Sequence, residues 1–282
     1  NVAIARAICA DLKMLSKHKT FGKINAATSV AYLVGPLLGG IMTDKQFFTG
    51  ATTSTPFYFI SLLFVLLAVL SAFIVKNTIE PATTSKETLW QRFNFITKLA
   101  ALFSNKQLKH LIITSTCFTL AVDIFYEFSP VYLTAKWVLT PTELILYNAA
   151  LATGLTIGNG WLAALIASRV SNLITIMGAM GSFIFLLLAV VLSNSHFLIF
   201  LWLLLSGLTI GVAVTILTVK ISDAASRNMQ GQVMGTQLSL RVLGDAVICL
   251  CGGALLIVSP KIILVVAAAV VLAAMVYFKT TT

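Results

Sequence analysis

The sequence has 282 residues, of which 59% are hydrophobic and 10% are charged. One soluble core of this size cannot bury so much apolar surface, which excludes an ordinary soluble globular domain and favours a protein that spans lipid. The formal net charge is +10. Membrane orientation and attraction to anionic lipid explain this charge, so no nucleic-acid partner is expected.

Eight apolar segments follow one another along the chain, and most reach the roughly 20 residues that cross about 30 Å of hydrocarbon. They cover residues 21–43, 57–75, 111–133, 143–167, 173–193, 197–219, 233–258 and 262–278. We therefore predict an all-α polytopic membrane protein with eight transmembrane helices. Residues 1–9 are apolar but too short to cross, and we interpret them as the end of a further helix.

The distribution of Lys and Arg predicts the orientation of these segments. Fourteen of them fall in the loops of one side, whereas the other side holds only Lys45, Lys136 and Lys261. The first side is therefore predicted to be cytoplasmic. We expect a multi-pass protein of the cell membrane, with the bacterial inner membrane as the expected location.

The longest polar stretch separates two apolar segments from six. It covers residues 76–107 and contains an amphipathic, basic pattern that predicts a helix on the cytoplasmic membrane face; an ordinary solvated loop helix is the alternative. The predicted organisation is a remainder of one helical bundle at 1–75, this linker, and a second bundle at 108–282.

An internal repeat relates the two predicted bundles. Its first copy contains Asp11, Gly22 and Gly39-Gly40, and its second copy contains Asp223, Gly235 and Gly252-Gly253. In both copies a polar cytoplasmic loop leads into a span that is rich in small residues and runs outward. This arrangement is typical of parallel repeats in transporters.

Small residues also line one face of the first span. Ala27, Ala31, Gly35 and Gly39 recur at intervals of four, around the sequence GPLLGG at 35–40. Such a face lets another helix backbone approach closely in lipid. Pro36 removes one helical hydrogen bond and favours a kink near the outer end.

The span at 143–167 carries a similar face. Ala150, Gly154 and Gly158 recur there at the same interval of four. We predict that these two small-residue faces meet and slide against each other.

The glycine pattern resembles a known family. Gly22, Ala31, Gly35-Pro36 and Gly39-Gly40 resemble the fifth-helix antiporter motif of the major facilitator superfamily, specifically the twelve-helix drug:proton antiporters, which have Gly where this chain has Ala31. The stretches 10–22 and 222–240 are similar to loops that precede helices five and eleven of that family. The resemblance covers nearly the whole chain.

The resemblance implies a major facilitator fold in which the eight spans are helices five to twelve and residues 1–9 end helix four. Helices one to four would then be missing, and they would be needed for function. It further implies alternating access by two rocking bundles, with helix five against helix eight. The expected partners are a small-molecule substrate, a proton and the lipid bilayer; the complete protein is expected to be a monomer.

Four charged residues stand out well inside the spans, because a charge at the bilayer centre costs about 2.5–3.5 kcal/mol and so needs a reason. They are Asp123, Glu127, Arg241 and Asp245. The span at 111–133 carries the first two and the span at 233–258 carries the other two, one turn apart in each case. Arg241 can therefore pair with Asp245 on its own helix or with an acid on the other helix. Three carboxylates near one cation cannot all be ionised cheaply, which predicts a proton-coupling or substrate site.

Other polar and aromatic residues are weaker candidates for a pathway, because most such residues in membrane helices serve packing or the interface. They are Tyr126, Asn148, Asn159 and Trp161. The sequence shows no catalytic or metal-ligating set, so neither an enzyme, a cofactor nor a metal is expected. A carrier of metabolites, sugars or siderophores is the alternative to drug efflux, because a shared fold does not fix the substrate.

Overall fold

The structure is a computed structural model, and it describes residues 17–43, 49–50, 52, 54–74, 99, 102–137, 139, 141–226 and 229–281. The chain divides into two compact units. The first comprises Asn1–Tyr32 with Ile96–Thr282, and the second comprises Leu33–Phe95. Asp11 and most of the predicted amphipathic helix lie outside the described residues.

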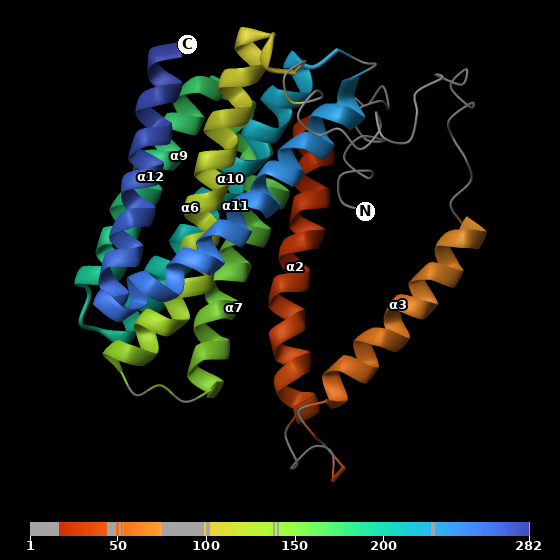
Figure 1. The fold of residues 1–282 in the computed structure, drawn as a ribbon, viewed down its shortest axis with the longest axis vertical. Coiled ribbons are helices and arrows are strands. Elements are labelled where there is room, and N and C mark those ends of the chain that lie inside the picture. The colour runs from red at the N-terminus through yellow and green to blue at the C-terminus, as the bar shows by residue number, and fades with distance from the viewer. Residues whose placement is uncertain are drawn as a thin grey trace. The chain divides into compact units, whose positions relative to one another are not determined.

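The described residues are almost entirely helical (Figure 1). The helices are α2 (Lys17–Thr43), α3 (Thr55–Ile74), α6 (Lys106–Lys136), α7 (Pro141–Ile157), η1 (Gly158–Leu162), α8 (Ala163–Ala167), α9 (Asn172–Leu192), α10 (His196–Ala224), α11 (Gln230–Val258) and α12 (Pro260–Thr281). In this part of the chain, eight helical segments are long and apolar enough to cross a membrane, with Glu143–Ala167 forming one of them. The predicted all-α fold and its eight spans are confirmed.

Lipid explains why these segments are helical despite their glycines and prolines, because backbone groups that cannot reach water must pair within the segment. Caps mark where two helices begin. Asn105 accepts a hydrogen bond from the backbone nitrogen of Leu108 at 3.2 Å, and Ser171 does the same for Ile174 at 3.5 Å. These side chains satisfy donors that the first helical turn leaves free.

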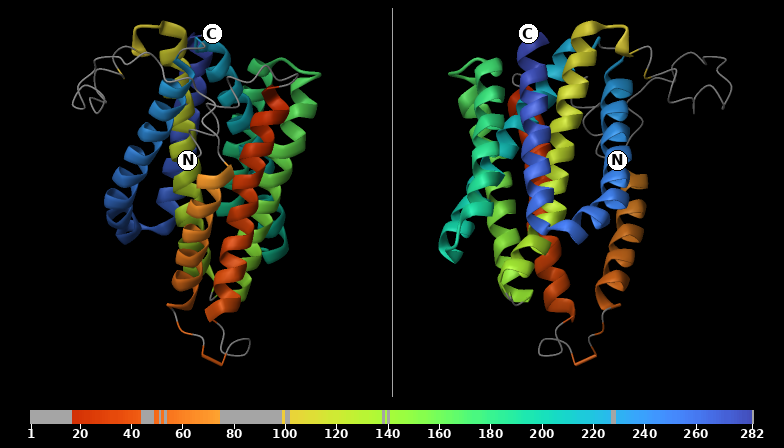
Figure 2. Two further views of the ribbon diagram at one scale, coloured as in Figure 1. Left: turned by 90° about the vertical axis from the view of Figure 1, so that its right-hand side faces the viewer. Right: turned by 60° about the vertical axis from the view of Figure 1, so that its left-hand side comes forward.

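In the first unit, α10 packs against α7 and α9, while α12 packs against α6 and α9. Helix α11 also packs against α6 and α12, and Figure 2 shows α6 and α12 side by side. Aromatic rings fill the contact between α6 and α9, where Phe118 and Phe125 meet the edge of Phe183 at centroid distances of 5.9 and 5.5 Å. This packing fixes the helices that line the site described below.

Glycines bring α10 unusually close to α7 and η1. A Cβ atom at Gly158 would lie 2.5 Å from the carbonyl oxygen of Leu208, and one at Gly211 would lie 2.7 Å from the nitrogen of Asn159. Gly154 faces the backbone of Leu204 in the same way. The two backbones therefore touch, and no side chain fits between them.

This contact corrects one prediction from the sequence. The face of Ala150, Gly154 and Gly158 was expected to meet the helix that carries GPLLGG, but Gly154 and Gly158 pack against α10. Spacing alone identifies a close-approach face and not its partner. The physical reason lies in α10, whose Gly207 and Gly211 provide a complementary face that also lacks side chains.

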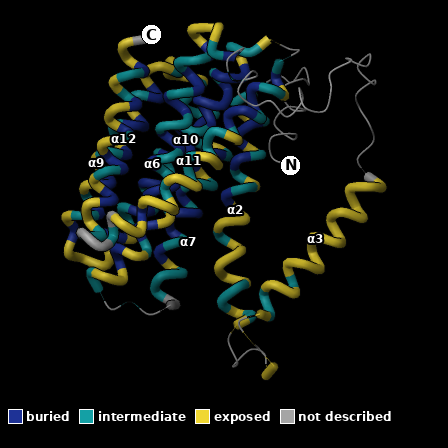
Figure 3. The backbone as a smooth tube through the Cα atoms, in the orientation of Figure 1, coloured by how far each residue is buried: buried dark blue, intermediate teal, exposed yellow. Residues whose placement is uncertain are grey.

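The second unit contains the C-terminal part of α2, from Leu33, and the whole of α3. Large apolar side chains of α3 are exposed on every side, including Phe57, Phe64 and Phe73 (Figure 3). A helix that is apolar all round is suited to lipid. Gly35, Pro36, Gly39 and Gly40 belong to this unit, and their role as an interface with another bundle stays a prediction.

Candidate functional site

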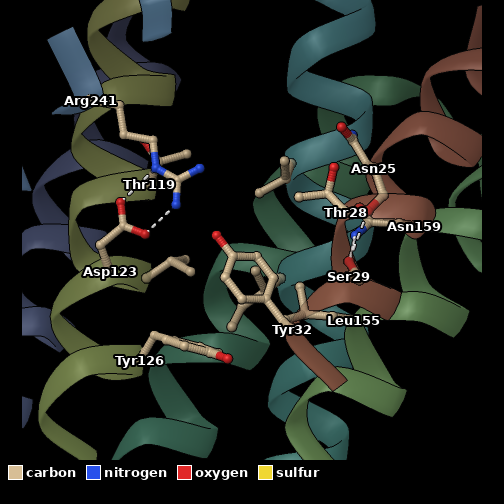
Figure 4. A pocket seen from close by; sticks show the side chains of 13 residues that line it. Asn25, Thr28, Ser29, Tyr32, Thr119, Asp123, Tyr126, Leu155, Asn159 and Arg241 are labelled. Atoms are coloured by element: carbon tan, nitrogen blue, oxygen red, sulfur yellow. Dashed lines mark hydrogen bonds and ion pairs between the residues drawn. The ribbon is translucent and has the colours of Figure 1, made fainter. Parts of the chain in front are cut away.

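A cavity of about 90 Å³ lies within the first unit, lined by residues of α2, α6, α7, η1, α10 and α11. Figure 4 shows its side chains in two groups. Arg241 and Asp123 form one group, and amide and hydroxyl side chains from α2 and η1 form the other. Because apolar residues dominate most helix surfaces in this chain, this concentration of polar groups marks the cavity as the candidate site.

An ion pair crosses from α11 to α6 at one wall of the cavity. The Nε atom of Arg241 donates to Oδ2 of Asp123 at 2.8 Å, and Nη2 donates to the other carboxylate oxygen. Asp123 is only 7% exposed. The predicted choice between two partners for Arg241 is thereby resolved, since it pairs across the helices. Two parallel hydrogen bonds help offset the cost of holding both charges within the span.

The other two predicted acids have different surroundings. Asp245 lies close enough to act electrostatically on both Asp123 and Arg241, and its Oδ1 atom is buried without a hydrogen-bond partner among the described residues. Glu127 is exposed and accepts a hydrogen bond from the Cys249 thiol at 3.6 Å. Two of the four predicted charges, Asp123 and Arg241, therefore line the cavity. Asp245 is near this pair but does not line the cavity, and Glu127 also lies outside its lining.

The opposite wall is a closed hydrogen-bond network. Asn25 of α2 donates to the Thr215 hydroxyl at 3.1 Å, and that hydroxyl donates to Oδ1 of Asn159 at 2.9 Å. The amide of Asn159 donates in turn to Ser29 at 2.9 Å, and Ser29 donates to the backbone oxygen of Asn25 at 2.9 Å. All four residues are buried. The network ties α2 to η1 and α10.

Helix α2 approaches closely where η1 begins. A Cβ atom at Gly22 would collide with the carbonyl oxygen of Asn159, and one at Gly160 would lie 3.1 Å from the Cβ atom of Ala26. The segment is a π-helical turn, a local widening that often occurs at functional sites. Gly22 of the predicted motif therefore contacts the span at 143–167. The contact is at Asn159 and not at the face formed by Ala150, Gly154 and Gly158.

Figure 4 shows Tyr32 between the two polar walls and Tyr126 on the side of the ion pair, below Asp123. The rings of Tyr32 and Tyr126 are tilted against each other with centroids 5.2 Å apart. Of the weaker candidates from the sequence, Tyr126 and Asn159 line the cavity. Asn148 does not line it, and Trp161 is 64% exposed.

Sequence reasoning missed several lining residues, namely Asn25, Thr28, Ser29, Tyr32 and Thr119. A usable signal existed in the spacing of polar residues within apolar spans. Asn25 and Ser29 are one turn apart on α2, as are Thr119 and Asp123 on α6. Residues four apart share one helix face.

An ion pair also joins the predicted cytoplasmic ends of α2 and α10. The Nζ atom of Lys17 lies 2.7 Å from a carboxylate oxygen of Asp223. Both side chains are partly exposed, so the pair contributes little stability by itself. The contact gives Asp223, the acidic residue of the second repeat copy, a partner at the end of a helix.

Helices that are long enough to cross lipid and that surround a charged, polar cavity are typical of multi-pass membrane transport proteins. The chain belongs to the Major Facilitator Superfamily, whose family model matches residues 3–249. The predicted major facilitator fold is therefore shown.

Comparison with a curated relative gives the same family. The chain is 27% identical over 257 residues to the uncharacterized MFS-type transporter YuxJ of Bacillus subtilis, covering 88% of this chain and 62% of the relative. The chain thus spans less than two thirds of the length of that relative.

Solved structures share the fold at low identity. The human organic anion transporter MFSD10 matches with a TM-score of 0.78 and 18% identity, covering 99% of this chain and 67% of that one. A bacterial homologue of the iron transporter ferroportin in its outward-facing state has a TM-score of 0.71 and 17% identity, with 99% and 68% covered. FucP in the outward conformation has a TM-score of 0.68 and 13% identity, with 99% and 72% covered.

Proposed function

We propose that this chain is the larger part of a proton-coupled transporter that exports drugs or other small molecules by alternating access. In this proposal Asp123 is the proton site, Arg241 is its charge partner, and Asp245 adjusts the charge around both. The proposal rests on one observation, the ion pair between Arg241 and Asp123 at the cavity wall.

The chemistry of that pair supports coupling. Binding of a proton to the Asp123 carboxylate removes its negative charge and so weakens its attraction for Arg241. The guanidinium group is then available to another acceptor, and the cavity changes its charge by one unit. A substrate that binds only one of these two charge states is thereby linked to the proton.

A second candidate is a carrier of organic anions or other charged metabolites. Asp123 engages two of the three nitrogen atoms of the Arg241 guanidinium, so an anionic group at the cavity could replace it. The relative MFSD10 is described as an organic anion transporter, although at 18% identity it shows the fold alone. In this candidate the proton and the anion enter the cavity together.

Transport by the purified full-length protein in liposomes tests both candidates. A pH gradient of either direction is imposed, a panel of lipophilic cations and organic anions is supplied, and a trapped dye reports lumenal pH. Proton movement opposite to the substrate supports efflux by antiport, and movement in the same direction supports the anion carrier. Proton coupling would be contradicted if a panel compound is transported at a rate that does not depend on the pH gradient and the lumenal pH stays unchanged.

A further inference from the structure

A second set of buried polar side chains lies between α6 and α11, outside the residues that line the cavity. The Nε2 atom of Gln237 donates to the Ser115 hydroxyl at 2.6 Å, across the two helices. Ser115 is 2% exposed and Gln237 is 8% exposed. A primary amide in an apolar span is costly, so its presence needs an explanation beyond packing.

Gln237 is satisfied at only one end of its amide. Its Oε1 atom is buried and has no hydrogen-bond partner among the described residues. If the amide oxygen and nitrogen of Gln237 were exchanged, the nitrogen would lack a partner instead of the oxygen. One buried polar atom of this amide is therefore unpaired in either orientation. Buried polar atoms of this kind are commonly satisfied by an ordered water molecule.

The spacing of residues connects this pair with the cavity. Ser115, Thr119 and Asp123 follow one another at intervals of four on α6, so they lie along one face of that helix. Gln237 and Arg241 are likewise one turn apart on α11. Thr119 lines the cavity, and its hydroxyl donates to the backbone oxygen of Ser115 at 2.9 Å. A polar file therefore runs from the ion pair toward the start of both helices.

That end of the file is near the predicted cytoplasmic side. At 1.5 Å per residue, Ser115 is about 14 Å from the beginning of α6, and Gln237 is about 10 Å from the beginning of α11. Asp123 is about 25 Å from the beginning of α6 on the same scale. The file thus spans part of the distance between the predicted cytoplasmic side and Asp123.

We propose that Ser115, Thr119 and Gln237 hold a file of water molecules through which protons reach Asp123 from the predicted cytoplasmic side. This inference rests on the proposed proton coupling. Hydronium at the entrance gives one proton to the first water, each water passes one proton on, and the last gives one to the Asp123 carboxylate. The carboxylate becomes a carboxylic acid, and a water molecule remains where hydronium entered.

The hydroxyl groups of Ser115 and Thr119 can both accept and donate, so they can take part in the file. Gln237 orients water and carries no proton itself. Among the described residues, the ionisable groups around Asp123 are Arg241 and Asp245 of α11, with Tyr126 of α6 and Tyr32 of α2 at the cavity. Glu127 lies one turn further out on α6 and is exposed.

Two substitutions at Ser115 isolate its hydroxyl group. Ser115→Thr and Ser115→Val add side chains of nearly equal shape, and only the first keeps a hydroxyl. Gln237→Met keeps length and removes the amide, and Thr209→Val on α10 is a control at a residue away from the file. Each full-length variant is placed in liposomes, and dye-reported proton movement is measured beside substrate exchange at equal pH on both sides.

The inference predicts that Ser115→Val and Gln237→Met slow proton movement by about a hundredfold and leave substrate exchange within about twofold. Ser115→Thr and Thr209→Val should behave like the unchanged protein. Equal rates of proton movement in Ser115→Thr and Ser115→Val would overturn the proposed file. If the Ser115 variants fail to fold, an unchanged rate of proton movement in Gln237→Met would overturn it. If Asp123→Asn also leaves proton movement unchanged, the proposed function fails with it.

Discussion

Asn25 of α2 and Thr215 of α10 are joined by a buried hydrogen bond of 3.1 Å, although 190 residues separate them in the sequence. Asn159 completes the connection by accepting from Thr215 and donating to Ser29. If the chain works by alternating access, as proposed above, we expect this contact to differ between the transport states. We therefore predict that its strength affects both the stability of the protein and transport.

Replacement of Asn159 with Leu should weaken the junction between α2 and α10. The change removes the acceptor of Thr215 and the amide that donates to Ser29, and each group left unpaired in a buried site costs about 1–3 kcal/mol. The thermal unfolding midpoint in detergent should fall. Asn148→Leu is the matched control on α7, because Asn148 does not line the cavity. Equal midpoints for the two variants would contradict this role of the network.

Replacement of Gly158 with Ala should separate η1 from α10. The new methyl group would lie 2.5 Å from the carbonyl oxygen of Leu208, and relieving such a clash costs about 1–3 kcal/mol. Gly178→Ala on α9 is the control, because a Cβ atom there meets nothing within 4 Å among the described residues. Thermal unfolding of both variants is the measurement, and an equally stable Gly158→Ala would show that the helices are not in backbone contact.

Cysteine labelling tests the predicted orientation. Ser168 follows α8 on the predicted cytoplasmic side, and Asn194 lies between α9 and α10 on the other side; both are exposed. In a full-length protein without its native cysteines, Asn194→Cys should react with an impermeant maleimide in intact cells. Ser168→Cys should react only after permeabilisation. The reverse pattern would invert the topology.

Gly35→Leu tests the proposed sliding face of the GPLLGG segment. A leucine there would project from the row formed with Ala27, Ala31 and Gly39, and would obstruct any backbone that approaches it. We expect loss of transport with normal insertion in the membrane. The matched substitution Ser61→Leu on the exposed surface of α3 should retain transport. Near-normal transport by Gly35→Leu would exclude this face as a moving interface.

The spans could be predicted from the sequence because hydrophobicity and length reflect the same lipid environment that forms the helices. The charged residues were also identifiable, since each costs free energy in lipid and so attracts attention. The pairing of Arg241 with Asp123 was one of two possibilities, and only the packing of α11 against α6 decides between them.

Other features depend on tertiary packing that periodicity does not encode. Gly154 and Gly158 were recognised as a close-approach face, but their partner is set by the glycines of α10. The network around Asn159 joins α2, η1 and α10, which no local pattern connects. The predicted boundary between bundles and the role of the GPLLGG face stay predictions.

Asp123→Asn tests whether Asp123 is the proton site. Asparagine keeps the size and much of the hydrogen bonding of the carboxylate but cannot bind or release a proton near neutral pH. The matched control is Glu127→Gln, which makes the same change one turn away on α6 at an exposed residue that does not line the cavity.

The decisive measurement is the rate of transport against pH for the unchanged protein and both variants in liposomes. If Asp123 carries the proton, Asp123→Asn abolishes transport driven by a pH gradient, retains substrate exchange, and shows no dependence on pH. Glu127→Gln should keep the pH profile of the unchanged protein. An unaltered pH profile in Asp123→Asn would contradict proton coupling at Asp123 and make this residue a structural partner of Arg241.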